Sequence, residues 1–351
     1  MNKPLLTFKQ ILYSYHIPKG KVLNTIACVY NNTFYLGIYD PTQIILVPIH
    51  SPVFYSDTAW DINPKDVKKL VRRNFDSVSF QVRVKRVLYR SPIGHQILYI
   101  AYFDSVSTRY RLILQSKNND ILNRITQALS VEKYHKGKLQ FPEDLTDTLD
   151  TLFATPGTCV FSKNYIHIHN ASSTVNMKLK HNLKQFSTST FALYLLRRVH
   201  SKKNFKYAIQ DDNAILHTQQ FTVITKHSNA IPVFTVKPEI TIPKAQIQVI
   251  YAYLQEMYSE DRLVQILPEK NQTRVVVLEG FNPIGSWYLS DETLPDSFLL
   301  PYSSALFAFG VLAKAKDEQI LLGHDDKHAV FHTSVLDIYT QIEPFNVYSY
   351  N

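Results

Sequence analysis

The chain has 351 residues, 45% of them apolar, so it can build one large hydrophobic core or two smaller ones. Its formal net charge of +9 favours an anionic partner. Two cysteines, Cys28 and Cys159, are too few for a disulfide framework or a thiolate zinc site, and nine glycines argue against several phosphate-binding glycine loops. The first residues do not form a signal peptide, and we expect no transmembrane segment.

The first third of the chain reads as antiparallel strands with one basic helix. Residues 25–48 alternate like a hairpin whose turn is Asn31-Asn32, a pair that tolerates positive φ. Residues 63–75 predict a helix capped by Asn63, with Pro64 at its first position. A meander of strands at residues 80–88, 96–103 and 110–114 follows, and then a helix at residues 121–129.

A helix at residues 143–153 and the break Thr155-Pro156-Gly157 precede the second part of the chain. We therefore predict two domains, a strand-rich α/β domain at residues 1–155 and an α/β domain at residues 156–351. The second contains a hairpin at residues 158–169, a helix at 188–200, strands at 221–225 and 233–236, and a helix at 243–258. No fixed-period repeat is visible. The predicted fold class is mixed α+β with strand-rich meanders.

Residues 274–316 carry the most distinctive pattern. A β-branched strand at residues 275–278 leads into a turn with Gly280, Pro283 and Gly285, and a helix of small and large apolar residues follows at 302–315. Strand, glycine turn and helix are typical of nucleotide-binding α/β domains. We expect this helix to be buried against the 275–278 strand rather than to span a membrane.

Two basic clusters are candidates for binding anions. The first comprises Lys68, Lys69, Arg72 and Arg73 on the 63–75 helix, and the second comprises Arg197, Arg198, Lys202 and Lys203. Nucleic acid and an anionic lipid surface are both suitable partners, and two solvated faces are the alternative.

No catalytic or metal site is predicted. His324, His328 and His332 are four residues apart, and His167 and His169 alternate on one strand, but each set is better explained by a solvated turn or strand face. No G-x-S-x-G elbow and no G-x-x-x-x-G-K-[ST] loop occurs. We therefore expect a protein that is not an enzyme.

Two segments together resemble the actin-like ATPase superfamily, and more closely its branch in type IV pilus and type II secretion assembly. Leu36-Gly37-Ile38-Tyr39-Asp40-Pro41-Thr42-Gln43-Ile44-Ile45-Leu46-Val47 follows the apolar frame of that family's first phosphate hairpin, and residues 247–313 follow the order of its adenosine segment. The resemblance implies two α/β halves around a cleft, with Gly37, Asp40, Thr42, Gly280 and Gly285 near a nucleotide.

This chain departs from that family at two positions. Tyr39 replaces the metal-holding Asp, and Pro41, which has no N–H, replaces the glycine of the phosphate turn. ATP hydrolysis is therefore not expected, and no cofactor is required.

The resemblance implies a non-catalytic scaffold that binds a partner protein in a cytoplasmic assembly, with the inner-membrane periphery as a second location. The alternative is a virus- or plasmid-encoded β-rich protein that binds nucleic acid or has a structural role, using Lys and Arg for phosphates and aromatic rings for bases. The oligomeric state is left open.

Overall fold

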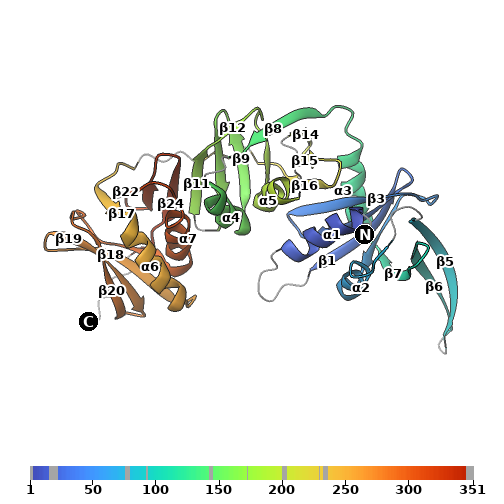
Figure 1. Ribbon diagram of the computed structural model, residues 1–351, viewed down its shortest axis with the longest axis horizontal. Coiled ribbons are helices and arrows are strands. Elements are labelled where there is room, and N and C mark those ends of the chain that lie inside the picture. The colour runs from blue at the N-terminus through green and yellow to red at the C-terminus, as the bar shows by residue number, and fades with distance from the viewer. Residues whose placement is uncertain are drawn as a thin grey trace. The chain divides into compact units, whose positions relative to one another are not determined.

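The computed structural model of the protein describes residues 3–15, 23–75, 80–91, 94–141, 145–171, 173–199, 204–228, 230–231 and 236–344 (Figure 1). Within these residues the chain forms seven α-helices and 24 β-strands. The predicted mixed α+β, strand-rich fold class is confirmed, whereas the expected pair of actin-like halves is not found in the described part of the chain. The predicted strand at residues 233–236 falls almost wholly outside the described residues.

One order of elements recurs along the chain: a leading strand, a helix, and then three strands. We call each copy a half-module, and each successive pair a module. The first module comprises α1 (Lys3–Ser14), β1 (Asn24–Tyr30), β2 (Thr33–Tyr39) and β3 (Gln43–Pro52), then β4 (Thr58–Ile62), α2 (Pro64–Leu70), β5 (Gln81–Ser91), β6 (Gly94–Asp104) and β7 (Arg109–Lys117). Among the described residues, no leading strand precedes α1.

The second module follows α3 (Asn119–Leu129) and includes one extra short strand, β12. It comprises β8 (His135–Gln140), α4 (Thr146–Ala154), β9 (Thr158–Ser162), β10 (Tyr165–His169), β11 (Ser173–Lys178) and β12 (Lys180–His181), then β13 (Ser187–Ser189), α5 (Thr190–Arg198), β14 (Asn204–Gln210), β15 (Asn213–His217) and β16 (Thr222–Lys226).

The third module repeats the order without additions. It comprises β17 (Ile240–Pro243), α6 (Lys244–Glu256), β18 (Arg262–Glu269), β19 (Gln272–Glu279) and β20 (Asn282–Ser290), then β21 (Phe298–Pro301), α7 (Tyr302–Leu312), β22 (Gln319–His324), β23 (His328–His332) and β24 (Leu336–Gln341).

The chain divides into two compact units. Unit 1 comprises Met1–Lys138 with Phe186–Ser228, and unit 2 comprises Leu139–Gln185 with Asn229–Asn351. Unit 1 has a sheet in the order β8-β14-β15-β16-β3-β2-β1-β4-β7-β6-β5, and unit 2 has sheets in the orders β9-β10-β11-β24-β23-β22-β17 and β20-β19-β18-β21. The domain boundary predicted near Thr155 divides the chain at one point, whereas each compact unit combines two separate segments of the chain. The boundary therefore stays a prediction.

The half-modules of one module exchange their leading strands. β4 pairs with β1, β17 with β22, and β21 with β18, so each leading strand adds to the sheet of the other half-module. The last strands then join one module to the next, because β16 pairs with β3 and β24 pairs with β11. Backbone hydrogen bonds therefore run unbroken across both module junctions.

Local sequence signals explain several elements. Asn31 and Asn32 both have positive φ, 46° and 57°, in the predicted β1–β2 turn. The Asn63 side chain accepts from the Lys65 amide at 2.9 Å and caps α2, and Asn118 caps α3 by accepting from the Ile121 amide at 3.1 Å. The predicted Asn31-Asn32 turn and the predicted Asn63 cap are thus confirmed.

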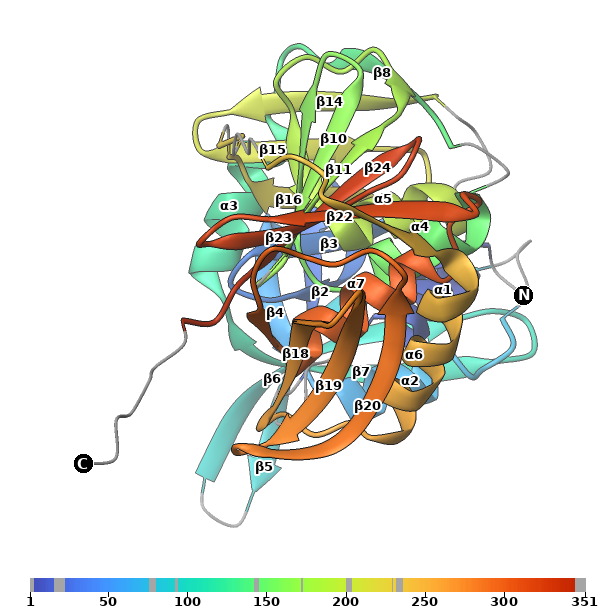
Figure 2. The same cartoon turned by 90° about the vertical axis from the view of Figure 1, so that its left-hand side faces the viewer.

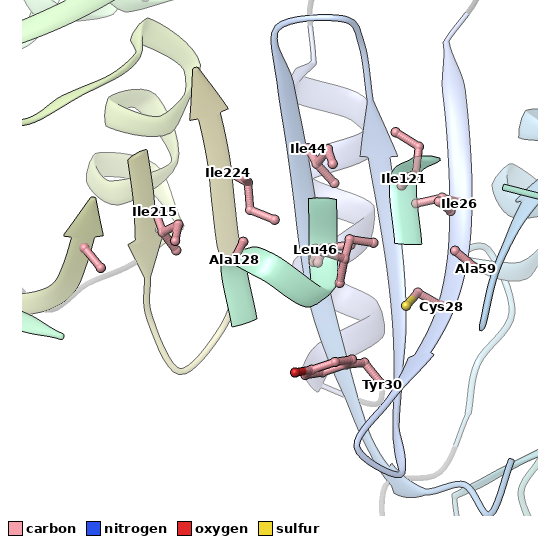
Figure 3. Packing of buried hydrophobic residues seen from close by; sticks show 12 residues of the cluster. Ile26, Cys28, Tyr30, Ile44, Leu46, Ala59, Ile121, Ala128, Ile215 and Ile224 are labelled. Carbon is pink, nitrogen blue, oxygen red and sulfur yellow. The ribbon is translucent and has the colours of Figure 1, made fainter. Parts of the chain in front are cut away.

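Helix α3 closes one face of the unit 1 sheet. Its Ile121, Ile125 and Ala128 lie in a cluster with strand residues including Ile26, Leu46 and Ile224 (Figure 3). All members of this cluster are less than about 9% exposed. Alternate residues of β1 and β3 supply its sheet side, as the pleat of a strand requires.

Helix α7 is buried, as predicted, but its neighbours differ from those expected. It packs against α6, α4, β18, β21 and β24, whereas we had expected β19, which covers residues 275–278. Figure 2 shows α6 and α7 beside the strands of the third module. Gly310 permits the close approach, since a Cβ there would lie 2.9 Å from the ring of Tyr251 on α6. Among the described helices, none is long and apolar enough to cross a membrane.

The stretch at residues 274–301 is a β-hairpin followed by a strand, not a strand that leads through a glycine turn into a helix. Gly280, with φ of 61°, lies in the turn between β19 and β20. Antiparallel β19 and β20 then pair from Thr273 and Ser290 to Glu279 and Asn282. The β-branched run predicted the strand correctly but could not specify its partner.

Burial of α7 makes Ala308→Glu a strongly destabilising change. Ala308 is fully buried, so an unpaired carboxylate there should cost about several kcal/mol and lower the melting temperature and the soluble yield. Ser303→Glu is the matched control, because Ser303 is exposed in the first turn of the same helix. Equal melting temperatures for the two variants would show that α7 is not in the core.

Candidate nucleic-acid interface

Three helices of unit 1, α1, α2 and α5, are connected by side-chain contacts. The Arg72 Nε, just after α2, donates a hydrogen bond of 3.2 Å to the hydroxyl of Tyr13 on α1. At the same carboxyl end of α1, the ring of Tyr15, just after the helix, meets the ring of Phe191 on α5 edge to face, with centroids 4.9 Å apart. The three helices therefore form one row, with α1 in the middle.

The row is strongly basic, with Asp66 as the acidic residue of its helices. Its basic residues are Lys3, Lys9, Lys65, Lys68, Lys69, Arg72, Arg73, Arg197 and Arg198. Asp66 contacts Lys69 at 3.4 Å, but both side chains are largely exposed and such a pair contributes little. The row therefore carries more basic than acidic residues, which favours an anionic partner.

The helices present these cations because each buries its apolar stripe. Val67, Leu70 and Val71 of the α2 region are fully buried, which leaves Lys68, Lys69, Arg72 and Arg73 exposed. The α5 helix likewise buries Leu193 and Leu196 and carries Arg197 and Arg198 in its last turn, where cations suit the helix dipole. Lys202 and Lys203 of the predicted second cluster lie outside the described residues.

The helices of unit 2 carry a different charge. Asp147 and Asp150 lie on α4, Lys244 and Glu256 on α6, and α7 has no charged residue between its ends. The basic face is therefore a property of unit 1 among the described residues.

Sequence reasoning missed α1 and with it Lys3 and Lys9. The signal was present, because Leu5, Phe8, Ile11 and Leu12 recur at helical spacing and all four are buried. Their spacing would have identified the middle helix of the row.

A hydrogen-bond network below the row joins α1 to α5. The Tyr15 hydroxyl donates to Asp40 Oδ2, and Gln43 Nε2 donates to the same hydroxyl at 3.2 Å. The Ser189 hydroxyl, which caps α5, donates to Gln43 Oε1 at 2.6 Å. Asp40 and Gln43, at the turn into β3, thereby fix the two helices to the sheet.

Asp40 is ionised in this network. Burial would raise its pKa, but hydrogen bonds from Thr42, Tyr15 and Gln43 outweigh burial and hold the pKa below its usual range. Burial and the bond to Asp40 raise the pKa of Tyr15, which therefore stays protonated and donates. Asp40 and Thr42 were predicted near a nucleotide, and here they form a local turn, with the Thr42 amide 2.7 Å from Asp40 Oδ1.

The other residues predicted near a nucleotide also have local structural explanations. Gly37 lies within β2, where a Cβ would come 2.6 Å from the Ile45 carbonyl oxygen, and at Gly285 in β20 a Cβ would meet the Trp287 ring at 2.2 Å. Gly37 and Gly280 belong to different compact units. A nucleotide at these positions stays an untested prediction.

Tyr39 joins a second network that anchors α3. Its hydroxyl donates to Asp61 Oδ1 at 2.8 Å, and Asn118, the α3 cap, donates to the same oxygen at 3.0 Å. Burial and the bond to Asp61 raise the pKa of Tyr39 to about 12.

His167 and His332 lie in strands of the unit 2 sheets, and the side chains of both make contacts there. His167 is 8% exposed, with ring nitrogens 2.6 Å from the Ser162 hydroxyl and 2.7 Å from Asn176 Oδ1, so the solvated strand face expected for it is wrong. His332 lies in β23 with Nδ1 2.9 Å from Asp337, and the turn at Asp325 is solvated as expected. Within the described residues, no group of three or more His, Cys, Asp or Glu side chains is placed to hold a metal.

One pocket of about 510 Å³ opens in unit 2. It is lined by Gln140, Asn164, Lys178, Leu179, Lys180 and Val335. The Leu179 amide donates to the Asn164 carbonyl at 2.8 Å and the Lys178 amide to the Val335 carbonyl at 3.0 Å, which fixes the pocket between two turns. Lys178 and Lys180 make part of its lining basic.

The architecture is that of the DNA polymerase sliding clamps. The DNA polymerase III β subunit of Thermotoga maritima is similar at a TM-score of 0.57 and 12% identity, over 98% of each chain. A putative β subunit from Eubacterium rectale gives 0.58 and 8% identity, also over 98% of each chain, and the Helicobacter pylori β clamp bound to a DNA ligase peptide gives 0.52 and 11% over 98% of each. No protein-family model and no curated protein sequence matches the chain.

At these identities the comparison establishes the fold, and it corrects the resemblance drawn from the sequence. The actin-like interpretation is wrong, and so are the pseudo-ATPase and the pilus or secretion scaffold inferred from it. The segment from Leu36 to Val47 matched because a buried strand, a turn and a second buried strand give the same apolar frame in many folds. Here they form the antiparallel pair β2 and β3. The alternative, a nucleic-acid-binding or structural protein, agrees better with the fold.

Neutralising the charges of α2 should weaken DNA binding and reduce its salt dependence. For Lys68→Gln/Arg73→Gln, each lost phosphate contact should lower the slope of log K against log salt by about 0.9. Binding of a labelled duplex measured across a salt series gives this slope. Lys270→Gln/Lys327→Gln removes two exposed lysines from turns of unit 2 and should leave the slope unchanged. Equal slopes for both double variants would contradict the assignment to α2.

The lowered pKa of Asp40 predicts an acid-dependent loss of stability. Because its folded-state pKa is depressed, its contribution is present above the unfolded pKa of about 3.9 and is lost as pH falls through the folded value. Asp40→Asn should therefore cost about 1 kcal/mol at neutral pH, and the difference from the parent should shrink in acid. Urea unfolding at neutral and acidic pH measures this. A constant difference across pH would show that the charge of Asp40 is unimportant.

Proposed function

We propose that this chain acts as a sliding clamp: copies join edge to edge into a ring around duplex DNA and hold partner proteins on it. The observation that carries the proposal is the continuity of the sheets at the module junctions, β16 with β3 and β24 with β11. In each junction, the last strand of a module pairs with the third strand after the first helix of the preceding module. This third strand is the last of its half-module, if the extra strand β12 is left aside. By the same rule, two last strands have no equivalent partner among the described residues: β7 of the first module and β20 of the third.

Both of these strands offer an unpaired edge. β20 ends the sheet β20-β19-β18-β21, and Pro283 within it suits an edge position. β7 is paired by β4 only near its carboxyl end, at Leu114 and Lys117. We therefore propose that β7 of one copy pairs with β20 of the next, which would repeat the junction seen twice within the chain and satisfy both edges.

Exposed apolar side chains lie beside both edges. Ile113 on β7 is half-exposed, and Phe281 and Ile284 at the start of β20 are 79% and 38% exposed. Large apolar side chains grouped at a strand edge are typical of protein interfaces. Their burial would add a hydrophobic contribution to the edge pairing.

The basic row of α1, α2 and α5 supplies the surface for DNA in this proposal. Lys and Arg contacts to phosphates bind any sequence, which suits a protein that must move along its ligand. Such a clamp would be a scaffold, and the absence of enzymatic activity stays a prediction. A peptide partner is proposed by likeness to the Helicobacter pylori clamp, which is bound to a DNA ligase peptide. The predicted cytoplasmic location is compatible with this role and stays a prediction.

A covalently closed ring should be trapped on circular DNA. Ile113→Cys/Ile284→Cys can be joined between copies by a flexible bismaleimide, because the native Cys28 and Cys159 are both buried. After cross-linking on a nicked plasmid, the protein should stay bound in salt of about 1 M, where surface electrostatics are screened. Cutting the plasmid once should release it. Gel filtration of the DNA before and after cutting gives the retained fraction.

Two controls make the retention specific. Each single-cysteine variant cannot close the ring and should leave circular DNA in the same salt. Phe281→Asp introduced into the double-cysteine protein should reduce cross-linking, because Phe281 is exposed beside the β20 edge, whereas Leu321→Asp, an exposed position on the internal strand β22, should not. Equal release of the cross-linked protein from circular and linear DNA would overturn the proposed ring.

A further inference from the structure

Strand β5 has an open edge among the described residues. In the other modules the first strand after a helix is covered by a leading strand from the other half-module, as β22 is by β17 and β18 by β21. The strand that would cover β5 by this rule is the leading strand of the first half-module. No such strand precedes α1 among the described residues, and β5 accordingly ends its sheet.

The open edge is long and regular. β5 spans 11 residues and pairs with β6 without a register shift from Gln81 and Asp104 to Ser91 and Gly94. It contains no proline and no bulge, so two common devices that block strand addition are absent from it. Figure 1 shows this hairpin extending from the rest of its unit. An incoming strand would find a continuous row of backbone donors and acceptors.

The charge of β5 selects the partner. Arg83 pairs with Asp104, and Lys85 lies 5.9 Å from the centre of the Tyr102 ring. Arg86 and Arg90 are exposed, and neither has an acidic partner among the described residues. Because side chains alternate along a strand, Arg86 and Arg90 share one face, and Arg83 and Lys85 share the other. An added strand would meet positive charge on both faces.

The outer part of the hairpin is apolar as well as basic. Leu88 is 66% exposed and lies directly opposite Ile97 on β6, which is 46% exposed, and Tyr89 beside them is about half exposed. Burial of leucine and isoleucine side chains stabilises a contact with a peptide, but it does not stabilise a contact with phosphates. The combination favours a protein partner over a nucleic acid.

We propose that β5 is a docking edge for an extended acidic segment of another protein, which adds to the sheet as the strand that covers β5. Acidic side chains of this segment pair with Arg86 and Arg90 on one face, and its apolar residues cover Tyr89 on the other face. A second copy of β5 is disfavoured because like charges would face each other across the new pair. This inference is independent of the proposed clamp function, since it concerns neither the helix row nor the β7 and β20 edges.

The test uses the full-length chain and a fluorescent decapeptide of alternating Glu and Val. Anisotropy should show binding at low salt that weakens as salt rises, and a Lys/Val peptide of the same length should not bind. Arg86→Glu/Arg90→Glu should weaken binding at least tenfold. Lys133→Glu/Lys184→Glu is the control with the same change in net charge at exposed positions, and it should bind as the parent does. Melting temperatures confirm that each variant is folded.

A second measurement separates strand addition from simple charge attraction. N-methylation of alternate residues on one edge of the Glu/Val peptide removes the amide donors that face β5, and a second peptide is methylated on its other edge. One of the two should lose binding at least tenfold while the other retains it. Equal binding of both methylated peptides would overturn the proposal. So would the absence of any Glu/Val binding, or a loss of affinity for a short DNA in Arg86→Glu/Arg90→Glu with peptide binding unchanged.

Discussion

The fold depends on the pairing of strand edges. A half-module supplies three consecutive strands and a helix, and its sheet is completed by a strand from the neighbouring half-module, as β4 completes the sheet that begins with β1. An unpaired backbone donor or acceptor costs about 1–3 kcal/mol when it is buried, so neither half-module is satisfied without the other. The same requirement continues across module junctions, where β16 pairs with β3. Stability and assembly in this chain thus rest on one kind of interaction, the antiparallel backbone ladder.

The charges of the helices differ between the modules, although the order of elements repeats. The elements follow one order in all three modules, yet the helices of unit 1 carry lysine and arginine while α4 carries Asp147 and Asp150. The buried network of Tyr15, Asp40 and Gln43 holds two of the basic helices at a fixed spacing. Charged side chains on a rigid row act together on an extended anion, because their spacing does not have to be ordered at the moment of binding.

Local features of this fold could be predicted from the sequence, and long-range pairing could not. Asn31-Asn32 requires a turn with positive φ wherever it lies, and Asn63-Pro64 begins a helix by capping its own amides. The repeat could not be seen in the sequence because the half-modules share an order of elements, not residue types or a fixed spacing. The exchange of leading strands joins residues such as Ile240 and Leu322, and no short window of sequence contains both. The mistaken nucleotide site arose in the same way, since β2, its turn and β3 satisfy an apolar frame that several folds share.

The exchange of leading strands also determines which unit can be duplicated or lost when a chain of this kind changes its length during evolution. Duplicating a single half-module would create a leading strand with no sheet to enter and a sheet with no strand to cover it. Duplicating two half-modules together gives each leading strand a sheet and each sheet a covering strand. Additions or losses of whole modules are therefore tolerated, and those of single half-modules are not. Among the described residues, β5 is the one first strand of a half-module that no leading strand covers, and it departs from the paired rule. Such a departure is sustainable at an outer strand such as β5, since solvent can satisfy the exposed edge there, and it would not be sustainable at a junction between modules.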